Sequence, residues 1–197
     1  VLNQAHGLND WFTELERNVD TALETLKTAV ALEKAENESV VKYTGSETPL
    51  PESSDSETAR LITRFTALLT HLNEEEAKQL CSRLKVQNQV SEIVSLACKF
   101  KGFLLNAQNS PADLLALFNG CDAWRREERF TLLLSAFAPY AHNKGIDWQR
   151  QRKRIENALS AANQVNVQDI IATGVKGPGI KDALNRAKLS AIASINT

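Results

Sequence analysis

The 197-residue chain contains no methionine and no close pair among its 3 cysteines. Because an initiator methionine is absent and the first residues already resemble part of a helix, we expect a fragment of a longer protein. No apolar run is long enough to cross a membrane, and no signal peptide is visible. We therefore expect a cytoplasmic chain without membrane contact, in which Cys81, Cys98 and Cys121 are small core residues in a reducing compartment.

The chain also lacks the short motifs of common enzyme classes. It has no Gly-rich P-loop, no paired-Cys motif and no Ser with a plausible nearby base. His6, His71 and His142 are far apart, and none has a second His or an Asp at the spacing of metal ligands. Near a predicted helix end, His71 is expected to be a polar cap or a core histidine. We expect no catalytic and no metal-binding residue in this chain.

Alternating strand patterns are missing too, whereas apolar residues recur at helical spacing through most of the chain. Helix starts are marked by Asn73 with Glu76 three residues later, by Ser110 followed by Pro111, and by Asp147. Short connections separate the predicted helices. The sequence predicts an all-α protein, a bundle or array of roughly eight to ten helices with no sheet.

One segment departs from the helical pattern. Residues 34–57 are acidic, rich in Ser and Thr, and contain Pro49 and Pro51. Such a composition buries too little apolar surface to offset the entropy of ordering, which predicts a loop or linker. The expected organisation is a helical segment at 1–33, the acidic loop or linker at 34–57, and a helical region at 58–197.

The net charge of −1 conceals an asymmetry along the chain. Residues 1–78 carry 15 acidic and 7 basic side chains, whereas residues 79–197 carry 9 acidic and 16 basic ones. A charge split between two parts of a chain indicates an anionic partner for the basic part.

A glycine turn is predicted within residues 169–192. A short helix is followed by Gly174, Gly177 and Gly179, and a second helix opens near Pro178. Glycine lets the backbone approach a ligand, a helix N-terminus offers free N–H groups, and Lys176 adds a full charge, so the segment suits a phosphate. The alternative is a plain helical hairpin in which Gly174 ends the first helix and the lysines are solvated.

Two groups of arginines accompany this turn: Arg125, Arg126 and Arg129, and then Arg150 and Arg154. The first group opens a predicted helix, where the glutamates at 127 and 128 could neutralise it through surface salt bridges. The second group lies on the helix face opposite Trp148. Together with the glycine turn, these cations suit a phosphate backbone better than stacking on single-stranded bases, because few aromatic residues accompany them.

Three segments carry a resemblance to a known family: KQLCSRLKVQNQVSEIVSLACKF, PADLLALFNGCDAWRREERFTLLLSA and GVKGPGIKDALNRAKLSAIA. In this order and at similar spacing, they closely resemble the C-terminal part of bacterial class II tRNA nucleotidyltransferases, the CCA-adding enzymes. The resemblance covers residues 60–195 well and residues 1–32 less clearly.

In that family an N-terminal α/β head transfers CMP and AMP to the tRNA 3′ end, and a helical body and tail hold the tRNA. This chain contains neither the GG motif followed by Arg-Asp nor the Asp-x-Asp of the head. The resemblance thus implies an excised C-terminal portion or a chain that has lost its head. Its implied partners are tRNA and the head of the same parent chain; Mg, CTP and ATP are expected only in the head, and no cofactor in this chain.

Many bacterial members also carry an HD phosphohydrolase site. On this chain the His-Asp pair falls on His71 and Leu72, and the earlier His falls near Glu24. Since leucine cannot ligate a metal, the resemblance implies a degenerate HD domain.

The favoured function is tRNA binding in tRNA processing, without catalysis by this chain itself. The predicted RNA contacts are Arg125, Arg126, Arg129, Arg150, Arg154, Gly174, Lys176, Gly177, Lys181, Arg186 and Lys188. Two alternatives are an HD-type metal-dependent phosphohydrolase or 2′,3′-cyclic phosphodiesterase, and a non-catalytic helical protein-interaction module.

Overall fold

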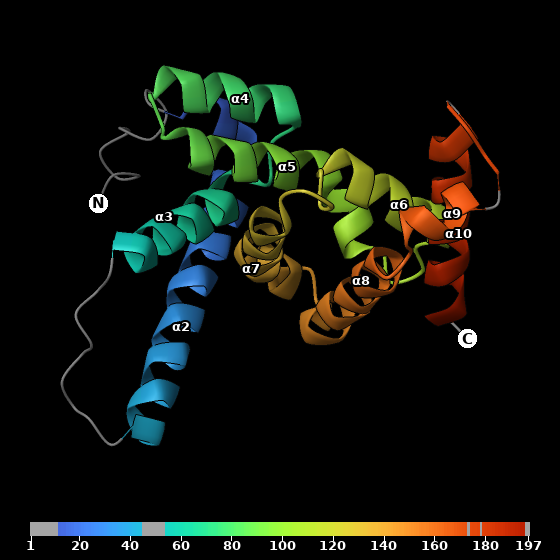
Figure 1. Ribbon diagram of the computed structural model, residues 1–197. Coiled ribbons are helices and arrows are strands. Elements are labelled where there is room, and N and C mark those ends of the chain that lie inside the picture. Colours follow the sequence, from blue (N-terminus) through green and yellow to red (C-terminus); the bar gives the residue numbers. More distant parts are fainter. Residues whose placement is uncertain (1–11, 45–53, 173, 178, 196–197) are drawn as a thin grey trace. The chain divides into compact units, whose positions relative to one another are not determined.

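The computed structural model describes residues 12–44, 54–172, 174–177 and 179–195, and every regular element in these ranges is a helix (Figure 1). The elements in chain order are the 3-10 helix η1 (Thr13–Asn18) and the α-helices α2 (Val19–Thr44), α3 (Ser54–Leu69), α4 (Glu74–Arg83), α5 (Asn88–Leu105), α6 (Pro111–Gly120), α7 (Glu127–Asn143), α8 (Trp148–Asn163), α9 (Val167–Ala172) and α10 (Gly179–Ile195). The predicted all-α fold is confirmed.

Helix starts follow the local signals of the sequence. Asn73 and Ser110 each form a capping box, in which the cap side chain accepts a backbone N–H and the third helical residue bonds back to the cap. Asp147 accepts the backbone N–H of Arg150 at the start of α8. All three predicted caps are therefore confirmed.

The predicted loop at 34–57 is wrong at both ends, because α2 continues to Thr44 and α3 already begins at Ser54. Residues 31–38 read ALEKAENE, and alanine, leucine, glutamate and lysine are strong helix formers even when they bury little apolar surface. Pro49 and Pro51 lie outside the described residues. The prediction of a loop or linker took only apolar burial into account and neglected intrinsic helix propensity.

The chain divides into two compact units. Unit 1 comprises residues 1–101 and 131–146, and unit 2 comprises residues 102–130 and 147–197. Two boundaries fall within α5 and α7, and the third lies between α7 and α8. Each unit is described separately. Apart from the bounds of the loop at 34–57, the predicted division into regions at 1–33, 34–57 and 58–197 stays a prediction.

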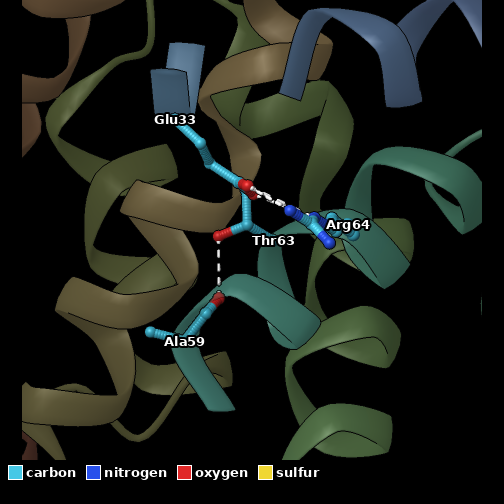
Figure 2. Close-up of polar contacts among 4 residues, drawn as sticks. All are labelled: Glu33, Ala59, Thr63 and Arg64. Atoms are coloured by element: carbon cyan, nitrogen blue, oxygen red, sulfur yellow. Dashed lines mark hydrogen bonds and ion pairs between the residues drawn. The ribbon is translucent and has the colours of Figure 1, made fainter. Parts of the chain in front are cut away.

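In unit 1, α2 packs against α3. Small side chains make this pairing close, since Ala22 and Ala29 of α2 are fully buried. At the rim, the guanidinium of Arg64 forms an ion pair with Glu33 at 2.7 Å, and the neighbouring Thr63 hydroxyl donates to the carbonyl of Ala59 at 3.0 Å (Figure 2).

In unit 2, α10 packs against α6, α8 and α9. Phe118 is fully buried and meets Trp124 and Phe130 edge-on, with ring centroids 5.5 and 5.7 Å away. Such edge-to-face pairs add to the stabilisation that burial of the ring supplies.

The three cysteines form no disulfide and are buried, as expected of small core residues. Burial raises the pKa of the Cys98 thiol to about 12, and this thiol donates to the carbonyl of Leu69. None of the described helices has the length and apolarity that crossing a membrane requires.

Core packing and surface ion pairs should contribute very different amounts to the free energy of unfolding. Phe118→Ala should lower the free energy of unfolding by about 3–5 kcal/mol, because it leaves a cavity in the core of unit 2. Arg64→Met should cost less than about 1 kcal/mol, because its ion pair is half exposed. Urea titration of both variants measures the difference, and equal losses would contradict core packing as the main source of stability.

Candidate nucleic-acid interface

The glycine turn between α9 and α10 depends on its glycines. Gly174 and Gly177 have φ angles of +87° and +59°, which side chains of L-residues rarely adopt. Gly174 donates to the carbonyl of Ile171 at 3.0 Å, and the carbonyl of Gly177 accepts the N–H of Ile180 at 3.1 Å. A Cβ at either glycine would meet nothing within 4 Å, so the backbone there is open to a ligand. Pro178 lies outside the described residues.

Exposed cations without an ion pair to any described residue lie on both sides of this turn. In the turn and α10 these are Lys176, Lys181 and Arg186, all members of the predicted set. On α8, Arg150 is also exposed and without such a pair, and so is Lys153, which the prediction did not include. These five side chains are available to an anion from solvent.

Arg154 is engaged inside unit 2. Its Nη1 and Nη2 donate to the carbonyls of Ala107 and Asn109, each at 2.7 Å. Gln151, one turn earlier on α8, donates to the carbonyls of Leu104 and Asn106. Arg154 therefore fastens α8 to the segment that joins α5 to α6, in addition to carrying a charge.

The arginines near α7 have local partners as well. Arg125 forms an ion pair with Asp122 at 2.8 Å, and the Nη2 of Arg129 donates to the carbonyl of Cys121 at 2.6 Å. Arg125 and Arg126 precede α7, which begins at Glu127, so the prediction that they open this helix is wrong. The turn at residues 121–125 delays the helix, since Asp122 has a φ of +51°.

Lys188 does not share the exposure of Lys181. Its ammonium lies 3.3 Å from the centroid of the Trp124 ring, and the indole Nε1 donates to the Asn119 side chain at 2.8 Å. Burial lowers the pKa of Lys188. A cation over an aromatic face at this distance is attracted by the ring, so Lys188 ties α10 to the turn between α6 and α7.

A shallow hollow of about 270 Å³ lies on α8 of unit 2. Its lining consists of Arg150, Lys153, Arg154 and Asn157 from α8, with Ile195 from the end of α10. The four α8 residues follow the i, i+3, i+4, i+7 spacing of one helix face. That spacing could have added Lys153 and Asn157 to the predicted contacts.

His71 of unit 1 is a half-buried histidine in a polar cluster. Its Nε2 lies 2.9 Å from the Thr25 hydroxyl, which also accepts from the Asn143 amide at 3.2 Å, and its ring meets Tyr140 edge-on. Burial lowers the pKa of His71 to about 4, and the charges of Lys144 and Lys101 act in the same direction. Among the described residues, no group of three or more His, Cys, Asp or Glu side chains is placed to hold a metal ion.

Comparison with known proteins finds many similar chains, of which three are described. The chain is 77% identical over 201 aligned residues to a CCA-adding enzyme from Alteromonas mediterranea, covering 99% of this chain and 50% of that protein. The resemblance to the C-terminal region of CCA-adding enzymes is confirmed. Multifunctional CCA proteins from Aliivibrio salmonicida and Pasteurella multocida are 32% and 35% identical over 126 and 132 residues, covering 62% of this chain and 31% of each relative.

The chain thus spans about half the length of the first CCA-adding enzyme that it matches. No protein-family model and no solved structure matches the chain. The contacts predicted for individual residues with RNA stay predictions, because these comparisons concern whole segments.

The contrast between Lys188 and Lys181 gives a matched pair of variants. Lys188→Met keeps most of the side-chain volume but removes the charge over Trp124, and should lower the free energy of unfolding by about 0.5–2 kcal/mol. Lys181→Met, at an exposed position of the same helix, should change it by less than about 0.5 kcal/mol. Thermal or urea unfolding measures both, and equal effects would contradict an anchoring role for Lys188.

Burial of His71 predicts a pH dependence of stability. Its pKa is about 4 in the folded chain and near 6.5 when unfolded, so the unfolded state binds more protons between these values. This contribution to stability is complete above pH 6.5 and is lost as the pH falls through 4. Against His71→Gln, the wild-type chain should lose stability over that window in urea titrations. Parallel pH profiles of the two proteins would contradict a histidine held neutral by burial.

Proposed function

We propose that this chain binds tRNA as the helical C-terminal region of a CCA-adding enzyme. In this proposal the addition of nucleotides to the tRNA 3′ end takes place in an N-terminal head of the parent chain. The proposal draws on the 77% identity to a CCA-adding enzyme over nearly the whole chain. The relative's name states the reaction of the whole enzyme, and the features of unit 2 suggest the part that this region has in it.

The observation that carries the proposal is a set of five exposed cations of unit 2 that form no ion pair with a described residue: Arg150, Lys153, Lys176, Lys181 and Arg186. Cations that are already paired with carboxylates gain little from an added phosphate, since they must first give up a partner. Cations without such pairs release the counterions of a nucleic acid at no such cost. This set therefore favours a polyanionic ligand.

The same unit favours the backbone of a folded RNA over single-stranded bases. Among its described residues no aromatic side chain is exposed: Phe118, Phe130 and Trp148 are buried, and Lys188 covers one face of Trp124. Proteins that bind single strands generally stack bases on exposed aromatic rings. Contacts to phosphates, which fix the position of a duplex without reading its sequence, remain the available mode.

The proposal assigns different roles to the predicted cations. Lys176, Lys181, Arg186 and Arg150 contact phosphates, and Gly174 and Gly177 let the backbone approach. Arg129, Arg154 and Lys188 act mainly inside the protein, because their donors or charges meet backbone carbonyls or the Trp124 ring. Mg, CTP and ATP belong to the head in this proposal, and the whole enzyme works in the cytoplasm.

Charge reversal tests the proposal. Lys176→Glu with Lys181→Glu should weaken binding of a tRNA transcript at least tenfold at moderate salt. The affinity should also depend less steeply on salt: the magnitude of the slope of log affinity against log salt should decrease by about 1–2. Each phosphate that a cation no longer neutralises reduces this magnitude by about one. Fluorescence anisotropy at several salt concentrations measures both quantities.

The matched control is Lys27→Glu with Lys34→Glu, which makes the same change of charge on exposed residues of α2 in unit 1. It should leave the salt slope near the wild-type value. If both double variants weakened binding alike, net charge rather than this surface would be responsible. A wild-type chain that binds no tRNA but forms a stable complex with a partner protein would favour the interaction-module alternative.

A further inference from the structure

The hollow on α8 has a size and a lining that the phosphate contacts alone do not explain. Its volume of about 270 Å³ lies just below the range of roughly 300–1,000 Å³ that is typical of pockets for small-molecule ligands. It is therefore suited to a small part of a larger ligand. Its walls differ in character, with cationic groups, one amide and one apolar side chain.

The cationic part of the lining favours an anion. Arg150 and Lys153 are exposed and form no ion pair with a described residue. Arg154 adds a third positive charge, and the two N–H groups that it directs to the carbonyls of Ala107 and Asn109 do not exhaust its donors. Among the residues that the structure describes, no carboxylate lines the hollow. A phosphate is the anion that an RNA backbone would offer here.

The remaining lining does not suit a bare phosphate. Asn157 is exposed and makes no hydrogen bond to a described residue, and its amide can both donate and accept. Ile195 is 40% exposed, although it is a large apolar side chain. A phosphate oxygen only accepts hydrogen bonds and gains nothing from an isoleucine. A ribose, by contrast, offers carbon atoms to Ile195 and a hydroxyl group that matches the amide.

We propose that this hollow is a ribose–phosphate subsite, in which Arg150 and Lys153 contact the phosphate and the amide of Asn157 bonds to the ribose 2′-hydroxyl. The proposal rests on the proposed function and adds to it a means of distinguishing RNA from DNA. The 2′-hydroxyl is the group by which a protein separates the two nucleic acids at a given position. Asn157 thereby becomes a specificity-determining residue.

The experiment compares two ligands and three proteins. The ligands are an RNA hairpin with the sequence of a tRNA acceptor stem and T arm, and the same hairpin with 2′-deoxyribose throughout. The proteins are the full 197-residue chain, its Asn157→Ala variant, and an Asn163→Ala variant at an exposed position near the end of α8, outside the hollow. Fluorescence anisotropy at one fixed salt concentration gives the ratio of RNA to DNA affinity for each protein.

Asn157→Ala should lower the RNA affinity about fivefold, the worth of one neutral hydrogen bond, and leave the DNA affinity unchanged. The preference for RNA then falls by the same factor. Asn163→Ala should keep the wild-type ratio. Because alanine favours helices, neither variant is expected to disturb α8, and circular dichroism checks this.

Two results would overturn the subsite. An unchanged ratio in Asn157→Ala would show that the amide does not meet the 2′-hydroxyl, and an equal loss for RNA and DNA would show a general rather than a ribose-specific contact. In both cases tRNA binding itself would stand. A wild-type chain that binds neither hairpin nor tRNA would instead remove the proposed function.

Discussion

Two hydrogen bonds, from the guanidinium of Arg154 to the carbonyls of Ala107 and Asn109, hold α8 of unit 2 to the segment that joins α5 to α6. These carbonyls lie in the segment after α5, which ends at Leu105. Gln151 satisfies two more acceptors of the same segment, at Leu104 and Asn106. Arg150 and Lys153, on the same face of α8, are exposed. Arg154 thus stabilises the helix from which the exposed charges of Arg150 and Lys153 project.

A second internal cation has a comparable position on α10. Lys188 rests on Trp124, whose indole is held in turn by Asn119, so that α10 is attached to the end of α6 by a short series of contacts. Lys181 and Arg186 then project from a helix with a defined orientation. The positive charges of unit 2 therefore fall into two groups. Arg154 and Lys188 make contacts inside the protein, whereas residues such as Lys181 and Arg186 are exposed to solvent. Composition alone counts both groups together.

The helical fold could be predicted from the sequence because its determinants are local. The caps at Asn73, Ser110 and Asp147 each depend on residues within one helical turn. The glycine turn depends on positive φ angles, which glycine adopts readily at positions 174 and 177. The error at residues 34–44 arose where local propensity and apolar pattern disagree. The similarity to CCA-adding enzymes was also accessible, since it rests on contiguous segments.

The candidate site could be predicted only in part, because its key contacts join distant positions. Arg154 meets a carbonyl 47 residues away in the sequence, and no periodicity indicates which cations are engaged in this way. In unit 1, the resemblance implied that the earlier His of the HD motif falls near Glu24, and the adjacent Thr25 forms a hydrogen bond with His71. Leu72, which follows His71, is buried, and the carbonyl of Leu72 accepts a hydrogen bond from the ammonium of Lys101 at 2.7 Å.

The three buried thiols have a practical consequence for chemical labelling. A maleimide reacts with the thiolate form, and burial both shields Cys81, Cys98 and Cys121 and raises the pKa of Cys81 and Cys98. A reporter group could therefore be attached through a single new cysteine on the exposed side of α8 or α10, without first removing the native ones. A spectroscopic label would then report on that one new position.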